Sequence, residues 1–267
     1  MRTVQDLTKL SGRRALLTGG AGHIGLAIGE ALVELGARVA VLDRDTAACT
    51  KRAAFLSRRR KNAAIPLACD LEDEAATRAA ARQAVQRLGG LDILIHAAAY
   101  VNDTSRPGWT VPFEEQTVEA FERAQRVNTA AAFALVQETR KELAASKRGS
   151  VILISSIYGM VGPDFSLYEG TGMRNPLGYG VSKAGVLQMT RYLATALAPS
   201  VRVNAITPGG VRRGQPAAFQ ARYVKKTPLG RMAVEEDFKG AIAFLASDLS
   251  AYVTGHNLVV DGGWTAW

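Results

Sequence analysis

Short apolar runs spread along the whole chain restrict the folds that this sequence can adopt. We predict seven buried strands from them, at residues 13–19, 38–43, 64–70, 91–97, 150–156, 201–208 and 257–260. Their near-continuous apolar character is typical of a parallel sheet that is covered on both faces. Helical patterns lie between them, at residues 23–36, 45–60, 72–88, 115–146, 179–198 and 235–247. This alternation predicts an α/β fold with a doubly wound parallel sheet of about seven strands and helices on both faces.

The composition fits one domain that spans residues 1–267. Apolar residues make up 48% of the chain and charged residues 21%, which are ordinary shares for a globular domain. No linker, repeat or low-complexity segment divides the chain. The first residues lack the apolar stretch of a secretion signal, and no 18 apolar residues run together. We therefore expect neither export nor a membrane span.

Cysteine usage and charge bear on location and partners. Cys49 and Cys69 lack the spacing of metal ligands, so we expect no metal site and a reducing, cytoplasmic environment. The chain carries 33 Lys and Arg against 24 Asp and Glu, a net charge of +9. Its one dense basic run, residues 58–61, ends a predicted helix, where the helix dipole favours cations. No nucleic-acid motif accompanies this charge, so a small anionic substrate is a better explanation for it than nucleic acid.

A Gly-rich turn follows the first apolar run. The sequence Thr-Gly-Gly-Ala-Gly-His-Ile-Gly, residues 18–25, leads from this predicted strand into the first long helix. Glycines at such a turn let the backbone approach a pyrophosphate, which the helix N-terminus attracts. Asp43 ends the second strand, where a carboxylate can bind both ribose hydroxyls of an adenosine and repel a 2′-phosphate. We therefore predict a Rossmann-type site that prefers NAD over NADP, although Arg44 could accommodate that phosphate.

Two further motifs supply candidate catalytic groups. Tyr179 and Lys183 are four residues apart, which places them on one face of a helix. We expect the lysine charge to lower the pKa of the phenol, whose ordinary value of about 10 is too high for proton transfer at neutral pH. Ser155 and Ser156 end the strand at 150–156 and point to opposite sides. A serine hydroxyl at that strand end can hydrogen-bond the substrate oxygen.

These motifs belong to an ordered set that covers essentially the whole chain. It consists of Thr-Gly-x-x-x-x-Ile-Gly, Asp70-Leu71, Asn128, Ser156, Tyr179-x-x-x-Lys183 and Pro208-Gly209-Gly210-Val211. The set resembles the compact Tyr-x-x-x-Lys branch of the short-chain dehydrogenase/reductase family. The resemblance implies that Tyr179 moves the hydroxyl proton, Lys183 also grips the nicotinamide ribose, and Asn128 holds a water of the proton relay. It also implies that the catalytic hydroxyl is the second of the pair, Ser156, with Ser155 packed beneath it.

The same resemblance assigns the cofactor contacts along the chain. They are Gly19, Gly22, His23, Ile24, Asp43, Arg44, Asp70, Leu71, Ala97, Tyr179, Lys183, Pro208, Gly209 and Val211. Three features depart from the family pattern: His23 replaces a usual glycine, residues 96–99 are His-Ala-Ala-Ala in place of Asn-Asn-Ala-Gly, and about ten extra residues separate Ser156 from Tyr179. The resulting Thr-Gly-x-x-Gly-x-x-Gly spacing is commoner among sugar-nucleotide epimerases.

The extra residues are expected to recognise substrate. The segment Phe165–Pro176 leaves the catalytic strand and returns at the catalytic tyrosine, and long loops in compact domains are usually functional. We predict substrate loops at about 157–178 and 210–232, with Ser156, Tyr168, Glu169, Arg174, Asn175 and Arg212 as contacts. The first loop resembles those of bacterial sugar- and glycan-biosynthesis members, which implies a sugar-like, nucleoside or other polyhydroxylated substrate. A surface loop or subunit contact is the alternative.

Three functions remain open from the sequence. We favour an NAD(H)-dependent oxidoreductase that interconverts a secondary alcohol and a ketone. An epimerase or dehydratase that retains NAD, and a cofactor-sensing module without turnover, are the alternatives. The resemblance also implies a homodimer or homotetramer built on the long Ala-rich helices. The C-terminal Trp264 and Trp267 are expected to cross a subunit boundary, because they are too apolar for a free tail.

Overall fold

Seven parallel strands form one sheet in the computed structural model, which describes residues 1–101 and 107–267. The strand order is β3-β2-β1-β4-β5-β6-β7, and every pairing is parallel. The strands are β1 (Arg14–Thr18), β2 (Arg38–Asp43), β3 (Ala64–Ala68), β4 (Ile93–His96), β5 (Gly149–Ile154), β6 (Val201–Pro208) and β7 (Asn257–Val260). The predicted single Rossmann-type domain with seven parallel strands is therefore confirmed.

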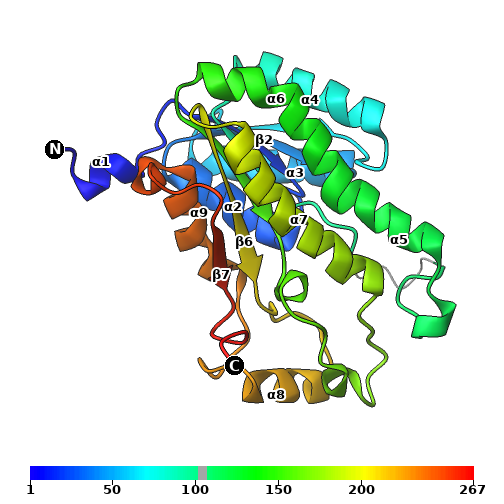
Figure 1. Ribbon diagram of the computed structural model, residues 1–267. Coiled ribbons are helices and arrows are strands. Elements are labelled where there is room, and N and C mark those ends of the chain that lie inside the picture. Colours follow the sequence, from blue (N-terminus) through cyan, green and yellow to red (C-terminus); the bar gives the residue numbers. More distant parts are fainter. Residues whose placement is uncertain (102–106) are drawn as a thin grey trace.

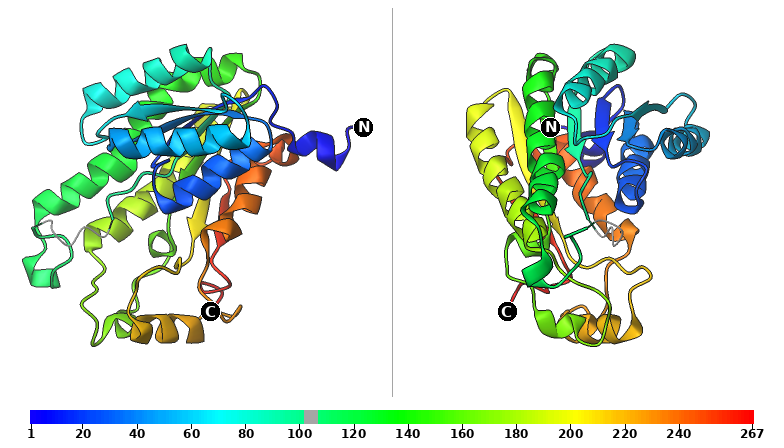
Figure 2. Two further views of the ribbon diagram at one scale, coloured as in Figure 1. Left: turned by 180° about the vertical axis from the view of Figure 1, so that it is seen from behind. Right: turned by 90° about the vertical axis from the view of Figure 1, so that its right-hand side faces the viewer.

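Helices cover both faces of this sheet (Figures 1 and 2). They are α1 (Val4–Thr8), α2 (His23–Glu34), α3 (Thr46–Arg59), α4 (Glu74–Leu88), α5 (Val118–Gln125), α6 (Ala131–Ala145), α7 (Leu177–Ala196), α8 (Ala217–Lys225) and α9 (Lys239–Ala246). Alternate strand residues face the two layers, as the pleat requires. Leu16 and Leu94 pack with α4, α6 and α7, whereas Leu17 and Ile93 pack with α2, α3 and α9.

The topology fixes where a ligand can bind. The chain builds β1, β2 and β3 outward to one side, then returns to place β4 on the other side of β1. The loops that follow β1 and β4 therefore diverge and leave a crevice at the carboxyl ends of these strands. The Gly-rich turn follows β1, and both predicted substrate loops follow strands on the β4 side of the sheet.

Three helical features differ from the sequence expectation. The predicted helix at 115–146 is divided into α5 and α6 by a π-helical turn, η2 (Arg126–Ala130), which contains Asn128. Helix α5 begins only at Val118, because Thr117 caps it by accepting a hydrogen bond from the Ala120 amide. Helices α1 and α8 form where no helix was predicted. No described helix is long and apolar enough to cross a membrane.

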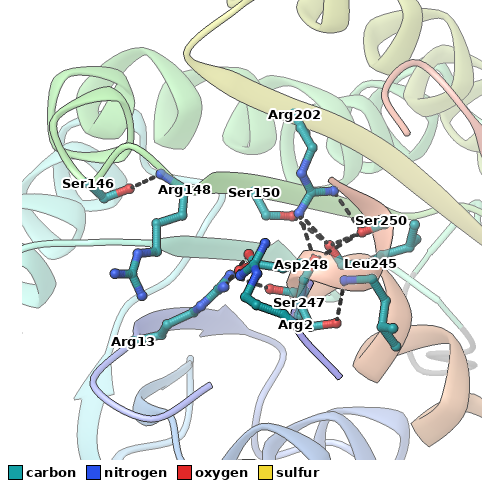
Figure 3. Close-up of polar contacts among 12 residues, drawn as sticks. Arg2, Arg13, Ser146, Arg148, Ser150, Arg202, Leu245, Ser247, Asp248 and Ser250 are labelled. Atoms are coloured by element: carbon teal, nitrogen blue, oxygen red, sulfur yellow. Dashed lines mark hydrogen bonds and ion pairs between the residues drawn. The ribbon is translucent and has the colours of Figure 1, made fainter. Parts of the chain in front are cut away.

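An arginine network closes the amino-terminal edge of the sheet, opposite the crevice (Figure 3). Arg13 is 2% exposed and donates hydrogen bonds to the Ala246 carbonyl and to Asp248, which also pairs with Arg2 at 2.5 Å. Arg202 donates to the Leu245 carbonyl at 3.1 Å, and burial lowers its pKa to about 10. These cations hold the carboxyl end of α9, where free carbonyls and the helix dipole attract them, against the starts of β1 and β6.

Candidate active site

A cavity of about 780 Å³ occupies the crevice at the carboxyl ends of the strands. Its walls come from the Gly-rich turn, the ends of β2, β4, β5 and β6, and the segments 157–178 and 210–232. The predicted cofactor residues that line it are Gly19, Gly22, His23, Ile24, Asp43, Arg44, Asp70, Leu71, Ala97, Tyr179, Lys183, Pro208, Gly209 and Val211. The structure therefore brings together residues that lie up to 192 positions apart in the printed sequence, between Gly19 and Val211.

The Gly-rich turn is packed too closely for side chains. A Cβ atom on Gly25 would lie 2.1 Å from the Gly19 carbonyl oxygen, and one on Gly19 would lie 2.5 Å from the Ala98 amide nitrogen. Gly19 also has a φ of 65°, which other residues rarely adopt. Helix α2 begins directly after Gly22, and its first residues line the cavity. The amide groups of this first turn have no partner within the helix. This bare backbone at a helix N-terminus fits the pyrophosphate of a dinucleotide.

Asp43 is held at the end of β2 beside this turn. Its carboxylate accepts hydrogen bonds from the Ala21 amide at 3.2 Å and from the Arg44 amide at 2.8 Å. Arg52, which the sequence reasoning missed, donates to the Ala21 carbonyl at 3.0 Å and fixes the same turn from α3. The carboxylate therefore stands where the adenosine ribose of a bound dinucleotide would lie, with lone pairs left to accept from ribose hydroxyls.

Ser156, Tyr179 and Lys183 meet where β5 ends. Tyr179 lies in the first turn of α7, and the Lys183 Nζ atom is 5.8 Å from the centroid of its ring. Lys183 is 2% exposed and donates to the Ile154 carbonyl at 2.9 Å. Ser156 faces Tyr179 as a hydrogen-bond partner. Ser155 packs beneath it, as expected, and donates to the Lys183 carbonyl at 2.8 Å.

The expected pKa of the catalytic phenol is wrong in direction. Burial raises the pKa of Tyr179, and the hydrogen bond from Ser156 offsets only part of this rise. Burial also lowers the pKa of Lys183 to about 8. Both shifts have one physical cause, because removal from water disfavours whichever form of a group is charged. The spacing of Tyr179 and Lys183 predicts the effect of the lysine charge on the phenol pKa, but it does not predict how burial shifts both pKa values.

Asn128 lies beneath the cavity and does not line it. Its side chain is fully buried, accepts from the Tyr100 amide at 2.7 Å and donates to the Ser182 hydroxyl at 2.8 Å. Ser182 in turn donates to the Tyr179 carbonyl at 2.7 Å. The side chain of Asn128 therefore positions the backbone of the catalytic helix, and the π-helical turn is what points it inward.

His96 is the first residue of the segment 96–99, which departs from the family pattern, and its contacts show what the histidine does there. Its imidazole lies between the Thr18 hydroxyl, 3.0 Å from Nδ1, and the Val127 carbonyl, 3.1 Å from Nε2. Val127 belongs to the π-helical turn, so His96 ties β1 and β4 to the segment that carries Asn128. Burial, together with the nearby Lys183 charge, lowers the pKa of His96 to about 3. The ring is therefore neutral at physiological pH, with Nε2 as the donor to Val127.

Aromatic side chains form the wall opposite the cofactor turn. Tyr168 and Asn175 line the cavity as predicted, and the Tyr168 and Tyr158 hydroxyl oxygens are 2.7 Å apart. Tyr158 was missed, although its place two residues after Ser156 was an available signal. Phe219 and Tyr223, four residues apart on α8, were missed as well; their spacing predicts one helix face.

Two predicted substrate contacts, Glu169 and Arg212, need correction. Glu169 is exposed and does not line the cavity, because it ends the 3₁₀ turn η4 (Phe165–Tyr168) and presents only its carbonyl inward, to Arg222. Arg212 also lies outside, since Val211 pairs with Ala233 and alternation along this extended segment turns the next side chain away. Arg213 lines the cavity in its place.

The remaining correction concerns the C-terminus. Trp264 is buried within its own chain, stacked on Tyr223 at a ring separation of 5.8 Å and edge-on to Tyr158 at 6.4 Å. The expectation that it crosses a subunit boundary is wrong, because the cavity's own aromatic wall supplies its apolar partners. Trp267 is 81% exposed. No cluster of His, Cys, Asp or Glu in the described part of the chain could hold a metal ion.

Comparisons with known proteins agree with this site. A family model described as Enoyl-(Acyl carrier protein) reductase matches residues 19–265. The cis-4-hydroxycyclohexanecarboxylate dehydrogenase of Sinomonas cyclohexanicum is 32% identical over 259 residues, which cover 95% of this chain and 97% of that protein. A short-chain dehydrogenase of Leptospira borgpetersenii with bound NAD⁺ has a TM-score of 0.84 and 32% identity, over 99% of this chain and 96% of its own.

A third relative contains the other nucleotide. The gluconate 5-dehydrogenase of Burkholderia cenocepacia, in complex with NADP and tartrate, has a TM-score of 0.84 and 28% identity, over 99% of this chain and 100% of its own. The doubly wound sheet and its Ser-Tyr-Lys site define an oxidoreductase that acts on CH–OH and C=O groups. The chain belongs to the short-chain dehydrogenase/reductase family.

Proposed function

We propose that this enzyme uses NAD(H) to interconvert a secondary alcohol and a ketone on a polyhydroxylated small molecule. The observation that carries the proposal is the meeting of Ser156, Tyr179 and Lys183 at the end of β5, beside a Gly-rich turn suited to a dinucleotide. When bound, the nicotinamide ring takes up or gives back the hydride. The protein's own groups then have to hold the reacting oxygen and move its proton.

The proton step belongs to Tyr179. In the oxidation direction, its phenolate accepts the proton of the substrate hydroxyl while Ser156 holds the same oxygen. Because burial raises the pKa of this phenol, deprotonation needs a nearby positive charge. Lys183 supplies that charge from one helical turn away, where its ammonium is also within reach of a bound ribose. In the reduction direction the phenol returns the proton to the forming alkoxide.

Asp43 supports NAD as the nucleotide. Its carboxylate is fixed by two backbone amides and carries a charge that would oppose a 2′-phosphate. Arg44 is exposed beside it and donates no side-chain hydrogen bond toward the turn in the described structure. The rigid carboxylate favours the two ribose hydroxyls over a phosphate, whereas the free Arg44 is the group that could accommodate a phosphate.

The polar groups of the first substrate loop support a substrate with several hydroxyl groups. Tyr168, Asn175 and the rim residue Arg174 all reach the cavity, as the loop's resemblance to sugar-biosynthesis enzymes implies. The name of one relative points the same way, since gluconate carries several hydroxyl groups; another relative is named for a six-membered ring with one hydroxyl group and a carboxylate. We propose segments 157–178 and 210–232 as the substrate loops.

We further propose a homodimer or homotetramer in the cytoplasm. Large apolar side chains are exposed on the outer helices, among them Val118 of α5, Phe133 of α6 and Tyr192 of α7. Such a surface favours association with a second copy. Both cysteines are free and buried, which suits a reducing compartment.

A substrate panel tests the catalytic proposal. Purified enzyme with NAD⁺ or NADH is offered ring alcohols, polyols, keto-sugars, nucleosides and nucleotide-sugars, and absorbance of the reduced nicotinamide is followed. Tyr179→Phe should abolish turnover while leaving the dissociation constant of NADH nearly unchanged, because only the proton-carrying hydroxyl is lost. Substantial turnover by this variant would refute the assigned proton step.

A further inference from the structure

A hydrogen-bonded trio of side chains lines the cavity that also holds the catalytic residues. The hydroxyl oxygens of Tyr158 and Tyr168 are 2.7 Å apart, and the Asn175 amide nitrogen donates to Tyr168 at 3.2 Å. All three side chains line the cavity. The catalytic Tyr179 lines the same cavity, and the charge of a Tyr168 phenolate would raise its pKa.

One of the two phenol O–H protons in this trio has no acceptor within the trio. The two phenols carry two O–H protons, and one hydrogen bond joins them. The Asn175 amide nitrogen, which points at the Tyr168 oxygen, is a donor and accepts neither phenol proton. Apart from each other and Asn175, the phenols have no hydrogen-bond partner among the described residues. Whichever phenol donates to the other, the proton of the second remains available.

Both protons are retained at neutral pH. Burial raises the pKa of Tyr158 and of Tyr168, so neither phenol ionises under ordinary conditions. A buried hydroxyl donor without an acceptor costs free energy, and an acceptor in the cavity removes that cost. The trio therefore forms a site for an oxygen atom with a free lone pair.

The surrounding rings hold this donor still. Tyr168 packs against Phe219 at 5.4 Å between ring centroids, and Tyr158 packs edge-on to Trp264 at 6.4 Å. Tyr223 stacks between Phe219 and Trp264, and its oxygen accepts the Gly210 amide at 2.5 Å. A donor fixed by packing loses little conformational entropy when it binds, so it discriminates strongly between substrates that do and do not carry its acceptor.

We infer that the Tyr158–Tyr168 pair donates a hydrogen bond to a second oxygen of the substrate, next to the reacting carbon. The enzyme then selects vicinal diols and α-hydroxy ketones over alcohols and ketones with one oxygen. This inference rests on the proposed function, because Ser156 and Tyr179 must hold the first oxygen. The aromatic walls around the trio suit a compact carbon frame such as a six-membered ring.

The test compares cis- and trans-cyclohexane-1,2-diol with cyclohexanol in the wild type, in Tyr158→Phe, in Tyr168→Phe and in the double variant. In the wild type, kcat/KM for the better diol isomer should exceed kcat/KM for cyclohexanol by about ten-fold or more. Each single variant still has one phenol proton to offer, so the preference should persist within a few-fold. The double variant has no phenol proton, and the Asn175 amide is the remaining donor of the trio, so most of the preference should be lost. Tyr192→Phe, an exposed phenol on α7, is the matched control and should behave as the wild type.

A second measurement separates this inference from the proposed function. Binding of the same alcohols to the NADH-loaded Tyr179→Phe variant, followed by calorimetry, needs no turnover. Diol preference in binding without any wild-type turnover would count against the proposed reaction and leave the subsite intact. Wild-type oxidation of cyclohexanol without diol preference, or a preference that survives in the double variant, would overturn the subsite.

Discussion

Lys183 and Ile154 are joined by a hydrogen bond of 2.9 Å, in which the lysine ammonium donates to the last carbonyl of β5. This bond holds the catalytic cation of the proposed site at the end of β5, 5.8 Å from the Tyr179 ring centroid. Because the ammonium is almost fully buried, one backbone carbonyl does not replace its lost hydration. The lowered pKa of Lys183, about 8, is the measurable sign of that cost.

Lys183→Met should alter how stability depends on pH. The unfolded lysine keeps its proton up to about 10.5, whereas the folded one loses it near 8. Between these values the unfolded state binds more protons, so this residue makes wild-type stability rise with pH. The methionine of the variant carries no proton, so the stability of Lys183→Met should lack this dependence on pH. We expect its free energy of unfolding, relative to that of the wild type, to decrease by on the order of 2 kcal/mol from about pH 7.5 to 9.5. Urea unfolding at both pH values checks this; a difference that stays constant would contradict the buried ammonium.

His96→Asn should remove an acid-sensitive contribution to stability. The ring has a pKa of about 3 in the fold against an ordinary value of 6.5, so below 6.5 the unfolded state binds more protons. Wild-type stability should therefore decrease as pH falls from 7 to 5, by about 2 kcal/mol more than in the variant. Denaturant unfolding at the two pH values gives the difference. The exposed His256 supplies the control, since His256→Asn should leave the acid dependence unchanged.

Two substitutions of Asp43 separate its charge from its hydrogen bonds. Asp43→Asn keeps an acceptor but removes the charge, so it should improve NADP binding while changing NAD affinity only a few-fold. Asp43→Ala removes both, and NAD affinity should fall by about ten-fold or more. Dissociation constants for both reduced nucleotides, followed by fluorescence, provide the readout. Tighter binding of NADP than NAD by the wild type would show that the proposed role of Asp43 is wrong.

Asp248→Asn should be far more costly than a similar change on the surface. It removes the negative charge that pairs with Arg13, which is 2% exposed, and leaves only neutral acceptors around that cation, among them the Ala246 carbonyl (Figure 3). Loss of a partner from a buried ion pair costs about 3 kcal/mol or more. Asp237→Asn weakens the pair with Arg231, whose side chain is 54% exposed, and should cost much less. Equal losses in thermal or urea unfolding would contradict a structural role for the Arg13 network.

Arg174→Ala tests whether the substrate is anionic. The side chain lines the cavity rim, is exposed and bonds only the adjacent Met173 carbonyl, so stability should not change. For a phosphorylated substrate, kcat/KM should fall several-fold, and the loss should diminish as salt screens the charge. Arg212→Ala, whose side chain does not line the cavity, is the control. A salt-independent loss would indicate hydrogen bonding to neutral hydroxyls instead.

The sheet was predictable from the sequence because each buried strand carries its own apolar signal. Most of the proposed cofactor residues could be placed in one cavity from the sequence because they follow strand ends, which a parallel sheet brings to one edge. The positions of Glu169 and Arg212 were not, since a loop's side-chain directions depend on the turn that it adopts. The π-helical turn around Asn128 was also missed, because its cause is tertiary: contacts with Tyr100, Ser182 and His96 come from distant segments.

The same limit applies to the pKa of Tyr179. Helical spacing showed that a lysine would lie near the phenol, and this was correct. Spacing contains no information about how deeply either group is buried, and burial is the larger contribution to both pKa values.

Helix α8 and the loop before α7 are fastened to each other along their length. Arg222 donates to the carbonyls of Leu167 and Glu169, Lys226 pairs with Asp164, and Phe219 packs on Tyr168. The two segments are more than 50 residues apart in the sequence, yet neither can shift without the other. Transplanting one of them into a relative would therefore separate each side chain from its support. To transfer substrate preference between family members, residues 163–175 and 216–226 have to be exchanged together.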